Sequence, residues 1–155
     1  MVDFSVFLGM FPVQFSQLQE FAMTIDWNDL VARFNNQTLA KEEWTHAAHL
    51  VTALWHILKY DNVECALCYL KPRIILRNYT VGTKNTDTGG YHETITVFWL
   101  QQVYAFVKRR SSRDFNVLVG ELLDEASFFE KEYILGFYPR ETLRTPRARG
   151  MYITP

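Results

Sequence analysis

The sequence predicts an all-α fold, a single-domain helical bundle of about five or six helices. The chain has 155 residues, a length that suits one domain with one core. Gly and Pro are scarce, with 7 and 5 residues, as expected where long helices are joined by short loops. Alternation of apolar and polar residues with a period of two, which indicates strands, is weak throughout the chain.

The first two helices are predicted from their capping residues and their apolar spacing. Residues 26–36 read as a helix capped by Asp26. A second helix is expected over residues 38–60, with Thr38 as its cap. Two glutamates, one of them Glu43, would then lie in its first turns, where the helix dipole favours carboxylates.

A third helix is expected to begin at Asp61, and Pro72 should kink or restart it. Residues 80–90, rich in Gly and Thr, form the clearest loop of the chain. A long apolar helix is expected to follow this loop over residues 91–110.

The last predicted helices are shorter. Ser111 or Ser112 would cap the first of them, and Ser127 would begin another that ends near Ile134. The final stretch of the chain reads as one or two helical turns followed by irregular chain.

The predicted elements divide the chain into three parts. Residues 1–22 would be an N-terminal arm, residues 23–135 the helical bundle domain, and residues 136–155 a C-terminal tail packing on the bundle. The tail carries four arginines, which either make a solvated basic segment or clamp an anionic group of a substrate.

Composition and charge argue against two classes of partner. The net charge is -1 at pH 7, so no basic excess is present to hold phosphate backbones, and we expect no nucleic-acid partner. No run approaches 18 uninterrupted apolar residues, so we expect no membrane partner. The N-terminus lacks the basic start of an export signal, and we therefore expect a cytoplasmic protein.

Three histidines lie on one side of the second predicted helix. His46, His49 and His56 are spaced by three and seven residues, so their side chains project to the same side. His46 and His49 are one turn apart and can reach a common atom. His56 lies about 10 Å farther along the axis, from a rise of about 1.5 Å per residue. We therefore expect His56 to be a packing residue.

The fourth histidine, His92, opens the next long helix. Imidazole nitrogen and carboxylate oxygen together suit Zn, Fe, Mn, Ni or Cu, so the pattern does not select one metal. We predict that His46, His49 and His92 bind one divalent transition metal ion. Glu43 or Glu93 would serve as a fourth ligand, as the hydrogen-bond partner of a ligand, or as a general base.

This ligand set predicts a metal-dependent enzyme, hydrolytic or oxidative, that acts on a small organic substrate. Three protein ligands would leave a position for water or substrate, and Trp44 and Tyr91 would form the pocket walls. The alternatives are a metal-free acid/base or ligand pocket, a structural metal, and a non-enzymatic module that binds a ligand or a protein, with structural histidines. The oligomeric state stays open, and a homodimer is one option.

Three stretches resemble the motifs of a family of small, uncharacterised bacterial proteins. They are TLAKEEWTHAAHL from Thr38, NTDTGGYHETIT from Asn85, and YPRETLRTPRARGMYITP from Tyr138. The resemblance covers about residues 33–154, and it implies no particular activity. Residues of this chain that match the family's motif positions are Glu43, Trp44, Thr45, His46, His49, Tyr91, His92, Glu93, Thr94 and Arg149.

His56 stands outside these motif positions. Ala40 replaces an expected Pro, Pro139 replaces an expected Ser, and the first 20 or so residues differ from the family. These departures affect a cap and the N-terminal arm and leave the His46 and His49 pair intact. Because Arg149 matches the C-terminal Arg of the family, we single it out as a substrate-binding residue.

Cys65 and Cys68 form a lone CxxC pair on the third predicted helix. No βαβ pattern surrounds the pair, as a thioredoxin-like redox site would require. We therefore favour small core residues over a redox or metal pair.

Overall fold

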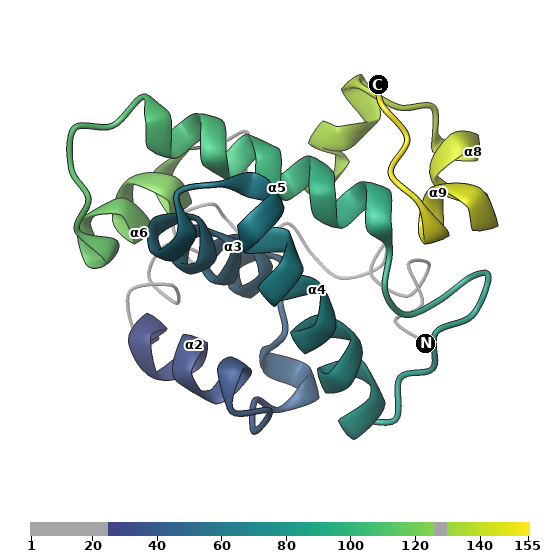
Figure 1. The fold of residues 1–155 in the computed structure, drawn as a ribbon, viewed down its shortest axis with the longest axis horizontal. Coiled ribbons are helices and arrows are strands. Elements are labelled where there is room, and N and C mark those ends of the chain that lie inside the picture. The colour runs from purple at the N-terminus through teal and green to yellow at the C-terminus, as the bar shows by residue number, and fades with distance from the viewer. Residues whose placement is uncertain (1–24, 126–129) are drawn as a thin grey trace, which may run out of the picture.

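The computed structural model of the chain describes residues 25–125 and 130–155. These residues form helices and loops, with no strand among them. Five helices have nine residues or more (Figure 1), and they are α2 (Trp27–Asn35), α3 (His46–Tyr60), α4 (Val63–Thr80), α5 (Glu93–Lys108) and α6 (Phe115–Asp124). The predicted all-α, single-domain bundle is confirmed. The predicted arm over residues 1–22 and the predicted start at Ser127 lie outside the described residues.

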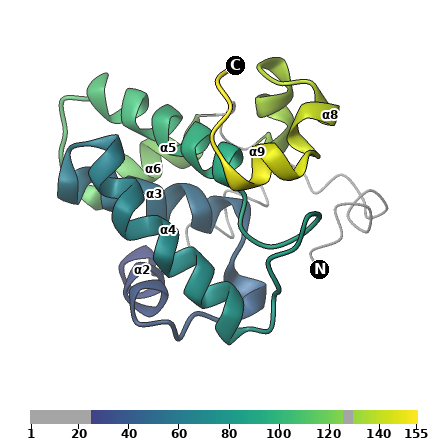
Figure 2. The same cartoon turned by 45° about the vertical axis from the view of Figure 1, so that its right-hand side comes forward.

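Shorter helical segments lie between and after these helices. Two are 3-10 helices, η2 (Lys41–Glu43) and η3 (Lys131–Gly136), and two are short α-helices, α8 (Arg140–Leu143) and α9 (Pro146–Gly150). In the C-terminal part, α9 packs against α5, and the last residues run beside the N-terminal end of α5 (Figures 1 and 2).

The helix α3 occupies the middle of the bundle. It packs against α2, α4, α5 and α6, and Figures 1 and 2 both show it among these four helices. The reason lies in its sequence, because apolar residues of α3 recur at intervals that cover most of its circumference. A helix of this kind is stable only when other elements cover it on several sides.

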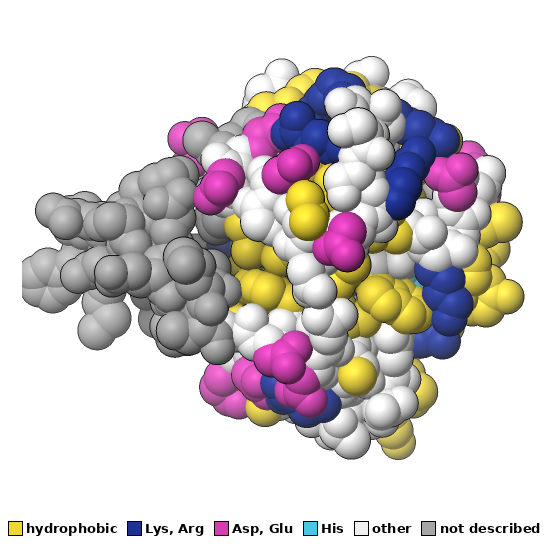
Figure 3. Space-filling model, turned by 90° about the vertical axis from the view of Figure 1, so that its left-hand side faces the viewer, with side chains coloured by type: hydrophobic (Ala, Val, Ile, Leu, Met, Phe, Trp, Pro, Cys, Tyr) yellow, Lys and Arg dark blue, Asp and Glu magenta, His cyan; other side chains and the backbone are white. Residues whose placement is uncertain are grey.

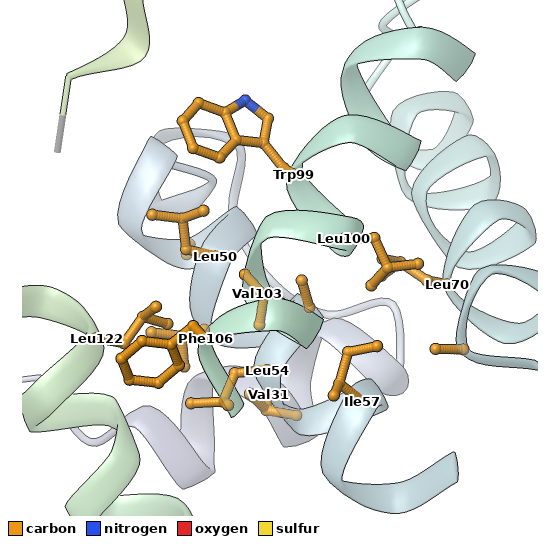
Figure 4. Close-up of a cluster of buried hydrophobic side chains, with 14 of the residues drawn as sticks. Val31, Leu50, Leu54, Ile57, Leu70, Trp99, Leu100, Val103, Phe106 and Leu122 are labelled. Atoms are coloured by element: carbon orange, nitrogen blue, oxygen red, sulfur yellow. The ribbon is translucent and has the colours of Figure 1, made fainter. Parts of the chain in front are cut away.

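Apolar side chains from all five longer helices meet around α3 and α5 (Figure 4). Nine of the labelled side chains are at most 3 % exposed. Burying one such side chain contributes roughly 1.5–3 kcal/mol. These nine are Leu50, Leu54 and Ile57 of α3, Leu100, Val103 and Phe106 of α5, Val31 of α2, Leu70 of α4 and Leu122 of α6, and the tenth labelled residue, Trp99 of α5, is 8 % exposed.

The helix α3 begins later than the sequence predicts. Thr38 does not cap it, and its hydroxyl instead donates to the backbone oxygen of Arg33. Thr45 is the N-cap, because its side-chain oxygen accepts a hydrogen bond from the backbone N–H of Ala48 at 3.2 Å. Glu42 and Glu43 both lie in the separate turn η2, and His46 becomes the first residue of α3.

Three other predicted helix starts are also shifted. Asp61 ends α3 in a left-handed conformation, with φ of 46°, and Asn62 caps α4. His92 caps α5 from outside the helix. Asp114, rather than Ser111 or Ser112, caps α6 by accepting the backbone N–H of Val117 at 2.9 Å. These segments all contain several polar residues that are able to cap, and tertiary contacts select one of them.

Pro72 neither ends nor restarts α4, which is continuous from Val63 to Thr80. Pro72 has no backbone N–H to donate to the carbonyl one turn earlier. Because Pro72 lies on the exposed side of the helix, water can reach that carbonyl instead.

Cys65 and Cys68 are exposed on the same helix, and the prediction that they are core residues is wrong.

Charged side chains of both signs lie together where α5 leads into α6 (Figure 3 shows the face that carries α6). Arg110 forms ion pairs with Glu121 at 3.1 Å and with Glu125 at 2.9 Å, and Arg109 contacts Glu125 at 3.2 Å. These groups are all partly exposed, so each ion pair contributes at most about 1 kcal/mol to the stability of the fold.

Within the described part of the chain, no helix is both long and apolar enough to cross a membrane.

Truncating the centre of α3 should destabilise the whole bundle. Leu54 is fully buried among residues of α2, α5 and α6. We expect Leu54→Ala to lower the free energy of unfolding by about 2–5 kcal/mol in urea denaturation, through lost burial and the cavity left behind. Val117→Ala on α6, where the side chain is 48 % exposed, is the control and should change it by less than about 0.5 kcal/mol. Equal effects of the two substitutions would contradict the central position of α3.

Candidate functional site

The first turn of α3 carries His46 and His49 on adjacent positions of one side. The N-cap Thr45 fixes this turn, since it binds the N–H of Ala48 with its side chain and the N–H of His49 with its backbone oxygen. His46 is the first residue of α3 and His49 lies one turn further along it, so both imidazoles start from the same turn. Their predicted role as a pair of metal ligands stays a prediction.

The ring of His49 is held in one tautomer. Its Nδ1 lies 2.7 Å from the backbone oxygen of Thr45, and because a carbonyl only accepts, Nδ1 must carry the proton. The lone pair of the neutral ring is therefore on Nε2. Although the residue keeps an exposed surface, the surrounding protein desolvates the ring and lowers the pKa of His49. His46, Arg77 and Lys131 add smaller electrostatic effects in the same direction.

Trp44 positions His49 from the other side. The indole ring stacks on Phe34, with ring centroids 4.7 Å apart and planes 7° apart, and it contacts the His49 ring at 4.0 Å. The guanidinium of Arg77 lies 5.0 Å from the same indole ring. Trp44 therefore packs against His49, and its predicted role as a pocket wall stays a prediction.

His46 faces α5. Its ring meets the ring of Trp99 edge-on, with centroids 4.9 Å apart and planes at 69°. Figure 4 shows Trp99 projecting from α5 on the side of Leu50. The indole ring of Trp99 therefore lies beside His46, and this neighbour was not predicted from the sequence.

Glu43 is engaged in local structure. Its carboxylate accepts hydrogen bonds from Arg33 at 2.6 Å and from the backbone N–H of Ala40 at 3.2 Å. The hydrogen bond from Arg33 is the main reason that the pKa of Glu43 is lowered. A carboxylate of this kind holds the turn η2 in place and is poorly suited to be a general base near neutral pH.

His92 is occupied at both ring nitrogens. Nδ1 accepts the backbone N–H of Ile95 at 3.3 Å, which caps α5, and Nε2 donates to the backbone oxygen of Leu143 at 2.8 Å. Burial is the main cause that lowers the pKa of His92 and keeps it neutral. The structure therefore does not present His92 as a ligand, in contrast to the predicted role.

Tyr91 and Glu93 form a small network with α4. The Tyr91 hydroxyl donates to Glu93 at 2.7 Å, and the ammonium of Lys71 contacts the same carboxylate oxygen at 2.8 Å. Burial, and then the bond to Glu93, raise the pKa of Tyr91. Tyr91 is only 8 % exposed, so it is a buried residue and forms no open pocket wall.

Arg149 binds backbone and not a free anion site. Its guanidinium donates to the backbone oxygens of Asp87 at 3.2 Å, Gly90 at 3.4 Å and Tyr91 at 3.2 Å. These contacts fasten α9 to the loop before α5. The predicted role of Arg149 in substrate binding gains no support from this arrangement.

The loop before α5 depends on Gly90. This residue has φ of +83°, and a Cβ at this position would come 2.8 Å from the Cα of Asn85. The side chain of Asn85 in turn accepts the backbone N–H of Tyr91 at 2.8 Å. The close approach of these two segments explains why a glycine precedes Tyr91 and His92.

Thr94, one of the residues at the motif positions, has a structural role that its place in the sequence did not indicate. Its hydroxyl donates toward the backbone oxygens of Ala148 at 2.8 Å and Met151 at 3.0 Å, and it accepts the backbone N–H of Ile153 at 3.1 Å. Thr94 is fully buried. Its place in the YHET stretch beside His92 was the only signal in the sequence.

His56 is fully buried, as expected for a packing residue. Its Nδ1 donates to the backbone oxygen of Thr52 at 2.8 Å, and its Nε2 has no hydrogen-bond partner. Burial is the main cause that lowers the pKa of His56 to about 4.

Taken together, all but one of the predicted site residues fall into two separate groups. His46, His49 and Trp44 lie together at the first turn of α3. Tyr91, His92, Glu93 and Arg149 tie the start of α5 to α4, α9 and the C-terminal segment. Glu43 belongs to neither group and pairs with Arg33 of α2. Among residues 25–125 and 130–155, no group of three or more His, Cys, Asp or Glu side chains is arranged to hold a metal ion. In the described part of the chain, His46 and His49 thus share the first turn of α3, while His92 is held at the start of α5 by Leu143 and Ile95.

Comparisons with family models, with curated proteins and with solved structures gave no match to this chain. The resemblance of the WTHAAHL and GYHET stretches to a bacterial family therefore stays a prediction.

Removing the Thr94 hydroxyl should loosen the C-terminal segment. We expect Thr94→Val to lower the free energy of unfolding by about 1–3 kcal/mol, because it leaves buried backbone groups of Ala148 and Ile153 without this partner. It should also speed proteolytic cleavage within residues 140–155. Thr88→Val, in the exposed loop before α5, is the matched control and should leave both measurements near wild type.

Protonation of His56 should destabilise the fold in acid. Its pKa is about 4 in the fold and about 6.5 when unfolded, so the unfolded chain binds more protons between these values. The stability that neutral His56 contributes is present above about pH 6.5 and is lost as the pH falls. We expect a loss of about 2 kcal/mol between pH 7 and pH 5.

The measurement compares urea denaturation of wild type and His56→Leu at pH 7, 6 and 5. The variant should lose less stability over this range, whatever its stability at pH 7. Parallel pH profiles of the two proteins would show that His56 is not the titrating group.

Proposed function

We propose that the protein binds one divalent transition metal ion through His46 and His49, and that a small organic substrate and water take the remaining positions on the ion. The observation that carries this proposal is the state of His49, whose Nδ1–H is bound by Thr45 and whose Nε2 therefore holds the lone pair. Histidines that ligate metals are commonly oriented by such a bond from the other ring nitrogen to a carbonyl.

The electrostatics of His49 support the same proposal. An imidazole must be neutral to bind a metal, and the lowered pKa of His49 keeps it neutral at and below pH 7. His46 lies one turn away and supplies the second nitrogen. Imidazole ligands accept Zn, Fe, Mn, Ni or Cu, so we propose either hydrolytic or oxidative chemistry.

The aromatic surroundings of the pair indicate the kind of substrate. Trp44 and Trp99 flank the two imidazoles and would form the apolar walls. The indole ring of Trp44 is stacked on Phe34, which holds it in place. The substrate class that fits is therefore a small organic molecule with an apolar or aromatic part that packs against these rings.

The proposal assigns no reaction role to the other predicted residues. Glu43 is held in an ion pair with Arg33, and Glu93 in an ion pair with Lys71.

We also propose that the protein is cytoplasmic and has no nucleic-acid partner. The two free cysteines support the first point, and the mixed charges around α6 (Figure 3) support the second.

A second candidate function is a non-enzymatic helical module that binds a ligand or a protein, with the histidines serving as structural residues. The specific observation in its favour is the role of the GYHET stretch. His92, Thr94 and the neighbouring Arg149 all bind backbone groups and so hold the C-terminal segment. If His49 is likewise a packing partner of Trp44, no metal is needed.

Metal titration separates the two candidates. After removal of metals with a chelator, wild type should bind one Co²⁺ or Ni²⁺ ion, with quenching of tryptophan fluorescence because Trp44 and Trp99 abut the histidines. His46→Ala and His49→Ala should each weaken binding by at least about tenfold, since each removes one of two protein ligands.

His92→Gln is the control in this titration. It lies outside the proposed pair, so we expect reduced stability but wild-type metal affinity once folding is verified by circular dichroism. If wild type binds no ion, or if the two alanine substitutions leave affinity unchanged, the metal proposal fails and the non-enzymatic module is favoured.

A further inference from the structure

The outward side of α4 is apolar along most of its length. In a surface helix the solvent side is normally polar, but here the exposed positions from Cys65 to Tyr79 carry no charge. Tyr69 is 47 % exposed, Leu76 50 % and Tyr79 81 %. We call this surface the outer stripe of α4, and it consists of Cys65, Cys68, Tyr69, Pro72, Leu76 and Tyr79.

The stripe is straight and continuous. At about 100° per residue, its six members fall within a sector of about 100°, and at about 1.5 Å per residue they extend over about 21 Å. The opposite side of α4, with Ala66, Leu70 and Ile74, is buried in the bundle. The helix is therefore apolar on both sides, and the bundle covers only one of them. Figures 1 and 2 show α4 along the outside of the bundle.

The charged residues beside the stripe are held by contacts within the chain. Lys71 pairs with Glu93 at 2.8 Å. The guanidinium of Arg73 donates to the backbone oxygen of Tyr69 at 2.8 Å and lies 5.8 Å from the Tyr69 ring. These two cations therefore border the stripe without crossing it, and the apolar surface between them is accessible.

We propose that two copies of this chain associate through the outer stripes of their α4 helices, which run antiparallel about a two-fold axis at Pro72. The sizes of the side chains favour this partner and this direction. The small residues Cys65 and Cys68 lie in the N-terminal half of the stripe, and the large residues Leu76 and Tyr79 lie in the C-terminal half.

An antiparallel pair centred on Pro72 places large side chains against small ones. Tyr79 faces Cys65 of the partner subunit, and Leu76 faces Cys68 of the partner subunit, because each pair of residue numbers is symmetric about 72. A parallel pair would instead set tyrosine against tyrosine. The antiparallel arrangement also brings the positive end of each helix dipole beside the negative end of the other.

The area of the stripe fits such an interface. Its exposed side chains present on the order of 500 Å² of apolar surface, within the range of the largest patches of soluble monomers, which are often functional. A standard interface buries about 800 Å² on each partner. The stripe alone therefore supplies more than half of this area, and contacts beside it would complete a dimer of moderate affinity.

Sedimentation of the full-length chain over a range of concentrations tests the association. We expect wild type to show a concentration-dependent equilibrium of monomer and dimer. Leu76→Glu and Tyr79→Glu should each weaken dimerisation by roughly tenfold or more, because they place a charge in the apolar interface. Val117→Glu, at an equally exposed apolar position on α6, is the matched control and should leave dimerisation unchanged. A wild type that stays monomeric, or charged variants that dimerise like wild type, would overturn the proposal.

Cysteine cross-linking tests the direction of the two helices. In a chain whose Cys68 has been replaced by Ser, Tyr79→Cys should be linked across the dimer to Cys65 by a short thiol-specific reagent, and the link should disappear when Cys65→Ser is also added. In wild type the two Cys68 side chains would lie about 12 Å apart along the axis, so a short reagent should link wild-type subunits poorly. A cross-link that persists when residue 79 is the only cysteine on α4 would join residue 79 to residue 79, would indicate parallel helices and would overturn the antiparallel arrangement.

Discussion

The burial of α3 is the constraint on which the rest of the structure depends. Four helices pack around it, and its residues Leu50, Leu54 and Ile57 occupy the centre of the core. Because these apolar positions leave little freedom for the helix to rotate, they also fix the direction of His46 and His49 at its first turn. The polar end of a helix that is otherwise buried is thus the natural place for a site in this fold.

Much of the fold follows from the sequence, because helix periodicity and the scarcity of Gly and Pro are properties of whole segments. The starting residues of the helices are less predictable. Thr38, Thr45 and Asp61 are all able to cap a helix, and the choice depends on contacts with other segments, such as the ion pair of Arg33 with Glu43. The effect of Pro72 also depends on its surroundings. It does not break α4, because the carbonyl that it leaves without a backbone donor lies on the exposed side of the helix.

The candidate site was also predictable only in part, because spacing along one helix is visible in the sequence and contacts with distant segments are not. The pairing of His46 and His49 follows from their spacing on one helix. The position of His92 depends on a partner 51 residues away, Leu143, that no local pattern reveals. A histidine in a helix start has two uses, as a ligand or as a cap, and only the distant contact decides between them. The same holds for Arg149, whose three acceptors all lie in the loop before α5.

The contacts of His92 and Thr94 with the C-terminal segment have a consequence for synthesis of the chain. Their acceptors, Leu143 and Ala148, follow them in the sequence by 51 and 54 residues. During translation the start of α5 is made before those residues, and its polar groups must stay hydrated until the acceptors are available. The N-terminal end of α5 therefore reaches its final state only after the segment around Leu143 and Ala148 has been made.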